Sequence, residues 1–122
     1  MNELKIPISA PEAKLWSVDD PNLYVCEVEL SERKELVDKD SRRFGFRWFE
    51  ASGIGEDAVF RLNGKRIMLR SAISWSFWPV NGIFPSEELA ERQIRIAKEL
   101  GLNMLNFHRF IGNTDVMNYA DE

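Results

Sequence analysis

The alternation of apolar and polar residues in the first part of the chain predicts β-strands. Apolar and acidic residues alternate from Val25 to Leu30, which is the period of a strand with one face buried. The almost entirely charged stretch 32–43 indicates an exposed hairpin or loop. The aromatic-rich stretch 44–50 predicts a further strand, because aromatic residues favour the pleated surface of a sheet. We expect the aromatic side chains of this strand to pack in a core.

A second hairpin is predicted in the middle of the chain. Two short apolar runs, 59–62 and 65–69, are separated by the dipeptide Asn63-Gly64. Asn-Gly supplies the two positive φ angles of a type I′ turn, which is the tight turn that joins antiparallel strands.

The last third of the chain changes from strand-like to helical periodicity. Ser86 is suited to cap a helix that ends before Gly101, and the two glutamates after Ser86 favour the positive end of the helix dipole. One stripe of this helix is apolar: Leu89, Ala90, Ile94, Ile96, Ala97 and Leu100. The short apolar run 103–108 predicts a buried parallel strand, and a second helix begins near Thr114. This order predicts a βαβ unit.

Composition narrows the classes of protein that the chain could represent. The 122 residues are 44% hydrophobic, which is enough for one globular domain with a core. The formal charge of −4 disfavours a nucleic-acid-binding protein, because phosphate contacts need clustered Lys and Arg. One cysteine and one histidine exclude an internal disulfide, a cysteine zinc cluster and a two-histidine metal site. The segment implies no cofactor.

The sequence does not determine the cellular compartment of the protein. No apolar run reaches the roughly 18 residues that a membrane-spanning helix needs. Residues 1–14 lack the long apolar core of a signal peptide. We therefore expect a soluble protein that does not contact a membrane.

Several short motifs together resemble glycoside hydrolase family 2, the family of β-galactosidases, β-glucuronidases and β-mannosidases. The matching segments occur in the family's order: Leu15-Trp16-Ser17 with Asp20-Pro21-Asn22-Leu23-Tyr24, Arg43-Phe44-Gly45-Phe46-Arg47, Phe60-Arg61-Leu62-Asn63-Gly64-Lys65-Arg66-Ile67-Met68-Leu69-Arg70, Ala97-Lys98-Glu99-Leu100-Gly101-Leu102-Asn103, and Tyr119-Ala120-Asp121-Glu122. Each motif alone is weak evidence, and the resemblance rests on their order.

The resemblance implies an α+β fragment of two domains. Residues 1–52 would be the C-terminal part of an immunoglobulin-like β-sandwich. Residues 53–122 would be a β-hairpin and the first βαβ unit of a truncated (β/α)₈ barrel, or TIM barrel. The family is a family of retaining β-glycosidases, which need two glutamates about 5 Å apart across the scissile bond. In the family these glutamates lie on later barrel strands, so the resemblance implies no catalytic residue within this chain, and we expect the isolated chain to be inactive.

The resemblance also identifies candidate sugar-binding residues at the carboxyl ends of the first two barrel strands, where active sites of such barrels lie. They are Trp75, Trp78, Asn81, Asn106, His108 and Arg109. Indole faces stack on the apolar faces of sugars, but these tryptophans could equally cover the barrel mouth. Asn106 occupies the position where the family usually has an arginine, and the loop 74–82 differs from that of well-known β-galactosidases. The sugar therefore stays open among galactoside, glucuronide and mannoside.

Two other classes of function compete with the glycosidase hypothesis. One is a non-catalytic carbohydrate-binding or structural module. The other is an RNA-binding module, which the acidic balance disfavours. A barrel interrupted after its second strand would leave apolar strand edges unpaired, so we also hypothesise that the chain self-associates.

Overall fold

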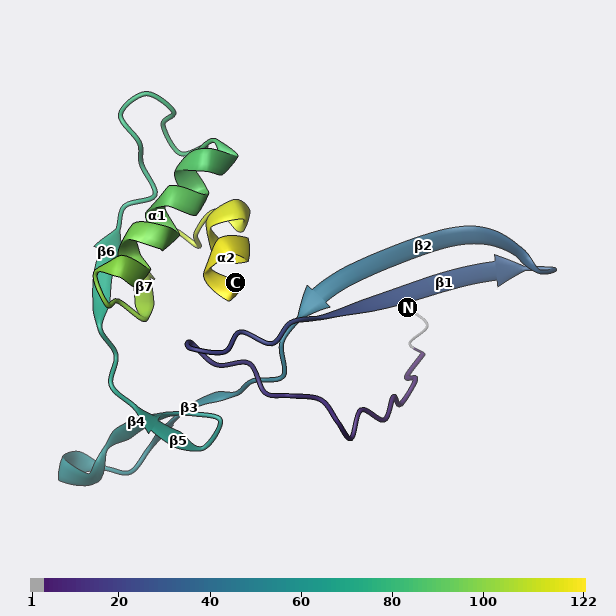
Figure 1. Ribbon diagram of the computed structural model, residues 1–122, viewed down its shortest axis with the longest axis horizontal. Helices are drawn as coiled ribbons and strands as arrows, with labels where there is room; N and C mark the ends of the chain where they lie inside the picture. Colours follow the sequence, from purple (N-terminus) through teal and green to yellow (C-terminus); the bar gives the residue numbers. More distant parts are fainter. Residues whose placement is uncertain (1–3) are drawn as a thin grey trace.

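The computed structural model describes residues 4–122 as a strand-rich α+β chain (Figure 1). Residues 1–3 lie outside the described residues. They begin both the expected sandwich domain and the segment 1–14, for which no signal peptide is expected. The elements in order are β1 (Tyr24–Glu32), β2 (Glu35–Phe44), β3 (Phe49–Ser52), a 3₁₀ turn (Gly55–Asp57), β4 (Val59–Leu62), β5 (Lys65–Ile67), β6 (Ser71–Ser74), α1 (Glu87–Glu99), β7 (Met104–Phe107) and α2 (Thr114–Asp121). In the described part they form three separate sheets: β1–β2, β3–β4–β5 and β6–β7.

The charged stretch 32–43 is the returning half of a long antiparallel ribbon that projects from the rest of the molecule (Figure 1). Of the two expectations for this stretch, the hairpin is therefore correct and the loop is wrong. All of β2 is exposed, so its sequence carries no alternation of buried and exposed positions. The two strands are joined by cross-strand ion pairs. Lys39 Nζ of β2 lies 3.1 Å from Glu27 and 3.3 Å from Glu29 of β1. Hydrogen bonds to these two carboxylates raise the pKa of Lys39.

The single strand predicted over residues 44–50 is wrong. Phe44 ends β2, Phe46 makes one isolated bridge with Leu15, and β3 begins only at Phe49. The interruption lies at Gly45, where a Cβ atom would stand 2.9 Å from Cβ of Trp16. The rings of Phe44, Phe46 and Tyr24 pack on one another with centroids 5.1–6.1 Å apart. They form a partly exposed cluster and not the buried core that the sequence predicts.

The second hairpin is confirmed. Asn63 and Gly64 have φ angles of 53° and 76°, and they join β4 to β5 as a type I′ turn requires. Strand β3 adds to the other edge of β4.

The βαβ unit is also confirmed, since β6 and β7 are parallel neighbours connected through α1. Ser86 caps α1, and its Oγ accepts a hydrogen bond from the backbone N–H of Leu89. The buried core of the described residues lies between the two helices and consists of Ala90, Ile94 and Val116. Trp78, Leu105, Phe107 and Tyr119 pack against this core.

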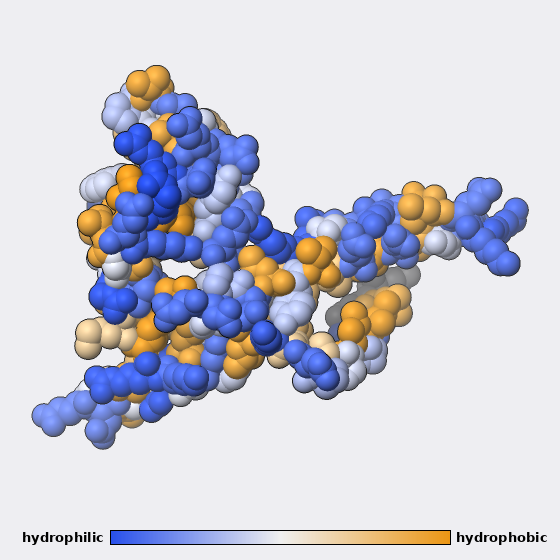
Figure 2. All heavy atoms as spheres, viewed as in Figure 1, coloured by the Kyte–Doolittle hydropathy of each residue, from blue (hydrophilic) through white to orange (hydrophobic). Residues whose placement is uncertain are grey.

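Much apolar surface stays open to solvent (Figure 2). Two of the six residues of the predicted apolar stripe are exposed, Ile96 on α1 and Leu100 directly after it. The outer face of the β6–β7 sheet exposes Ile73 and Met104. None of the described helices has the length and apolar character that crossing a membrane would require.

Candidate functional site at the carboxyl ends of β6 and β7

Two strands end side by side and bring Trp75 and His108 together. Ser74, the last residue of β6, pairs with Phe107, the last residue of β7. The backbone N–H of His108 donates to the carbonyl of Ser74 over 2.9 Å, which extends the pairing by one residue. The rings of Trp75 and His108 consequently lie 4.2 Å apart between centroids, at an angle of 50°. Trp75 is 65% exposed, so one side of this pair is open to a ligand.

The residue after Trp75 and the residue after His108 both have a strained backbone. Ser76 and Arg109 have φ angles of 49° and 53°, in the left-handed region that is unfavourable for residues other than glycine. Each such residue costs on the order of 1–3 kcal/mol, and such residues concentrate at functional sites. Ser76 and Arg109 are each the second residue after the paired strand ends Ser74 and Phe107. The loops that follow β6 and β7 therefore change direction at equivalent positions.

A buried polar cluster supports the end of β6. Ser74 Oγ accepts hydrogen bonds from Gln93 Nε2 at 2.8 Å and from the backbone N–H of Ser76 at 3.3 Å. Ser76 is 2% exposed, and its Oγ and the Oε1 of Gln93 have no hydrogen-bond partner among the described residues. The cluster fixes the strand end to α1. Ser74, Ser76 and Gln93 were not among the predicted site residues, although two serines in an otherwise apolar stretch were a signal.

The other predicted site residues lie in different surroundings. Trp78 is half-buried against the core, and its backbone closes a turn with Gly82 through hydrogen bonds of 2.8 and 2.9 Å. Asn81 is exposed within that turn. Asn106 is exposed on β7 opposite Ile73. The alternation of a strand places Asn106 on the same face as the position of His108.

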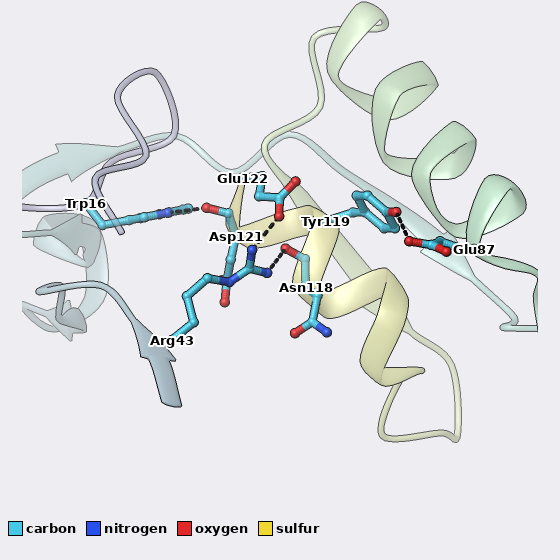
Figure 3. Close-up of polar contacts among 7 residues, drawn as sticks. All are labelled: Trp16, Arg43, Glu87, Asn118, Tyr119, Asp121 and Glu122. Atoms are coloured by element: carbon cyan, nitrogen blue, oxygen red, sulfur yellow. Dashed lines mark hydrogen bonds and ion pairs between the residues drawn. The ribbon is translucent and has the colours of Figure 1, made fainter. Parts of the chain in front are cut away.

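A separate set of contacts anchors α2 to the first part of the chain (Figure 3). The indole Nε1 of Trp16 donates to the backbone carbonyl of Asp121 over 2.6 Å. Arg47 pairs with the Asp121 carboxylate at 2.7 Å, and its guanidinium stacks 4.2 Å from the ring of Trp16. Arg43 donates to the carbonyl of Asn118 at 3.1 Å. It also forms an ion pair with Glu122.

A cleft of about 500 Å³ lies between this anchor and the α1–β7–α2 unit. Its lining includes Trp16, Arg47, Ile94, Leu105 and Met117, and its walls are mainly apolar. None of the six predicted sugar-binding residues lines it. The cleft and the Trp75–His108 pair are therefore two distinct features.

Comparison with known proteins relates both the sequence and the fold to one family. The family model described as glycosyl hydrolases family 2 matches residues 1–47. A putative β-glucuronidase of Formosa agariphila is 32% identical over 89% of this chain, and a β-galactosidase of Thermoanaerobacterium thermosulfurigenes is 30% identical over 91%. The chain spans 13% and 15% of the lengths of these two relatives.

Solved structures give the same relationship. The β-glucuronidase of Parabacteroides merdae matches 88% of this chain with a TM-score of 0.76 and 28% identity. A family 2 glycosyl hydrolase of Bacteroides cellulosilyticus matches 88% with a TM-score of 0.79 and 27% identity. The chain covers 13% and 14% of those structures. The resemblance indicated by the sequence motifs is thus confirmed: this chain belongs to the glycosyl hydrolases of family 2.

Proposed function

We propose that this chain is the segment of a retaining β-glycosidase in which a β-sandwich domain joins a catalytic barrel. Residues 1–52 would complete the immunoglobulin-like sandwich, and residues 53–122 would begin the (β/α)₈ barrel. The parallel β6–α1–β7 unit followed by α2 supports this assignment, because alternating strands and helices build such a barrel. The substrates would be β-linked galactosides or glucuronides, in line with the names of the relatives. The family resemblance of the motifs adds β-linked mannosides.

The observation that carries the proposal is the contact between the exposed Trp75 and the half-buried His108 at the carboxyl ends of two parallel strands. This is the end of a barrel at which active sites lie. The indole would stack on one face of the sugar ring, and His108 and Asn106 would donate or accept hydrogen bonds at its hydroxyl groups. Arg109 would line the rim of this sugar-binding pocket. Trp78 and Asn81 belong to the loop after β6 and would close the same side of the pocket.

The reaction itself would need two carboxyl groups about 5 Å apart, one as acid and base and one as nucleophile. The acid protonates the leaving oxygen, and the nucleophile attacks the anomeric carbon to form a covalent glycosyl intermediate that water hydrolyses. We assign neither role to a residue of this chain. We therefore expect it to bind sugars without hydrolysing p-nitrophenyl β-glycosides.

The test is a sugar titration followed by the intrinsic tryptophan fluorescence of the chain. We expect a methyl β-glycoside to change the emission, and Trp75→Ala to weaken its binding about five- to tenfold, because a stacking surface is lost. Trp48→Ala is the matched control, since Trp48 is similarly exposed but lies near the β4–β5 turn. Equal loss of binding in both variants, or no binding by the wild-type chain, would overturn the proposal.

A further inference from the structure

We propose that Gln93 of α1 is a positioning residue of the site at the ends of β6 and β7, where it fixes the backbone that presents Trp75 to the sugar. The inference rests on the proposed function, because it requires a sugar that stacks on the Trp75 indole. It goes beyond that function by assigning the placement of the stacking surface to a residue of the neighbouring helix.

The first observation is the path of contacts from α1 to Trp75. Helix α1 lies beside β6, and Gln93 Nε2 donates to Ser74 Oγ over 2.8 Å (Figure 1). The backbone carbonyl of Ser74 accepts from the N–H of His108 over 2.9 Å. Ser74 is thus bound to α1 through its side chain and to the end of β7 through its backbone. Because Trp75 is the next residue, both contacts restrict the position of its indole.

The second observation is that the backbone is held on both sides of Trp75. Ser74 is 7% exposed and Ser76 is 2% exposed. The N–H of Ser76 donates to Ser74 Oγ over 3.3 Å, so one hydroxyl group binds both Gln93 and the backbone that follows Trp75. Trp75 itself is 65% exposed. An exposed aromatic ring on a fixed, buried backbone loses little conformational freedom when a ligand binds to it.

The third observation is that this cluster includes features that lower stability. Ser76 has a φ of 49°, and its Oγ and the Oε1 of Gln93 have no hydrogen-bond partner within residues 4–122. A left-handed backbone and a buried polar atom without a partner are both unfavourable. An apolar side chain at position 93 would remove the unpaired Oε1. The hydrogen bond from Gln93 to Ser74 therefore fits a role in the site better than a role in stability.

The test follows the ring resonances of His108 by NMR. His108 is the only histidine of the sequence, so its ring protons have a single assignment. The rings of Trp75 and His108 lie 4.2 Å apart between centroids, so the ring current of the indole shifts these resonances. Trp75→Ala gives their positions without that contact. The methyl resonances of Val116, which is fully buried, report whether the core between the helices is intact.

The variants separate the path of contacts from the helix that carries it. Gln93→Met retains a side chain of similar length and removes its polar atoms. Ser74→Ala removes the acceptor, and Ser74→Thr restores a hydroxyl group at that position. Arg92→Met is the matched control, because Arg92 is an exposed neighbour of Gln93 on α1.

We expect Gln93→Met and Ser74→Ala to move the His108 ring resonances toward their positions in Trp75→Ala. Each should weaken binding of a methyl β-glycoside about threefold, because part of the stacking contact is lost. The double variant should weaken it no further, since both substitutions break the same hydrogen bond. Ser74→Thr should recover most of the affinity that Ser74→Ala loses.

The control and the core resonances limit the interpretation. Arg92→Met should bind the sugar as the wild-type chain does, and the Val116 methyl resonances should stay unchanged in Gln93→Met and Ser74→Ala. Equal weakening by Arg92→Met would overturn the inference. A change of the Val116 resonances in both disrupting variants would also overturn it, because the effect would then come from the core.

The remaining outcomes distinguish the inference from the proposed function. Wild-type affinity for the sugar in Gln93→Met, together with weakened binding in Trp75→Ala, would overturn the inference and leave the proposed function standing. No sugar binding by the wild-type chain would overturn the proposed function and the inference with it.

Discussion

At the scale of single residues, the motifs that carry the family resemblance act mainly on the backbone. Asn63 donates from Nδ2 to the carbonyl of Trp16 at 2.8 Å. Asn103 accepts at Oδ1 from the N–H of Arg70 at 2.7 Å and donates from Nδ2 to the carbonyl of Met68 at 3.0 Å. These amides tie segments that are distant in sequence, so the motifs specify architecture and leave substrate choice to the loops.

Asn103→Ala should destabilise the fold, because it leaves the N–H of Arg70 and the carbonyl of Met68 without their side-chain partner. We expect a loss of about 1–2 kcal/mol in the free energy of unfolding, measured with urea. Asn81→Ala is the control, since the Asn81 side chain has no partner among the described residues and is exposed. An equal effect of the two substitutions would contradict this role of Asn103.

Tyr119 links the two helices through a titratable group. Its hydroxyl donates to Oε1 of Glu87 over 3.1 Å. Partial burial raises the pKa of Tyr119 above 10.0, and the hydrogen bond to Glu87 raises it further. A raised pKa in the folded state favours the protonated phenol, so its contribution to stability is complete below about pH 10 and is lost as the pH rises through the folded-state pKa.

Tyr119→Phe should therefore lower stability near neutral pH and remove the extra loss of stability above pH 10. The tyrosinate absorbance of the wild-type chain should also show a late-titrating phase that disappears in Tyr119→Phe and persists in Tyr24→Phe. A late phase that survives in Tyr119→Phe would show that another group causes it.

At the scale of elements, the sequence predicted the helices and strands whose ends are specified by neighbouring residues. It did not predict those whose ends depend on tertiary contacts or that lack an apolar period. The Ser86 cap and the Asn63-Gly64 turn act within a few residues, so α1 and the β4–β5 hairpin could be read from the sequence. The extent of β2 could not, because an exposed ribbon needs no apolar period. The break at Gly45 arises from the approach of Trp16, which is a tertiary contact that local propensity does not encode.

Helix α2 is held at its C-terminal end by residues that come from the first part of the chain. Cationic side chains are favourable there, because the helix dipole is negative at that end. Arg43 lies at that end, and the indole of Trp16 satisfies one of its last carbonyls (Figure 3). Arg47 also binds there, through its ion pair with Asp121.

The Arg47–Asp121 pair can be tested by a double-mutant cycle with Arg47→Ala and Asp121→Ala. Both side chains are about one third exposed, so we expect a coupling energy of only about 0.5–1 kcal/mol in urea unfolding. The Arg95–Glu99 pair on the open face of α1 gives the reference for a simple surface pair. A coupling of zero for Arg47–Asp121 would contradict its role as an anchor.

At the scale of the whole molecule, the fold is extended and its core is small. The β1–β2 ribbon projects from the rest of the chain (Figure 1). The buried apolar residues of the described part are confined to the contact of the two helices. Val28 and Leu30 of the ribbon and Ile73 of β6 are more than half exposed. The site at the strand ends is thus carried by a unit that buries little apolar surface of its own.

We expect the isolated chain to self-associate, because exposed apolar faces and unpaired strand edges favour contacts between copies. Sedimentation velocity at increasing protein concentration should show a rising average mass. A single compact monomer throughout the concentration range would contradict this expectation.

The sequence could place the site in part. The family resemblance, applied to the strand run 103–108 and to the aromatic loop before α1, identified Trp75 and His108 separately as candidates. Their stacking depends on the parallel register that pairs Ser74 with Phe107, and spacing along the chain does not determine such a register. Spacing along the chain also does not determine the contact between Gln93 and Ser74, because Gln93 lies on α1 and Ser74 on β6.

The central claim is that the ends of β6 and β7 form one part of a sugar-binding pocket. The most direct measurement is a ¹H–¹⁵N correlation spectrum of the chain titrated with methyl β-glucuronide. We expect the shifts to be confined to residues around Trp75, Asn106, His108 and Arg109. Shifts centred instead on the cleft beside Trp16, or a spectrum that the sugar leaves unchanged, would contradict the claim.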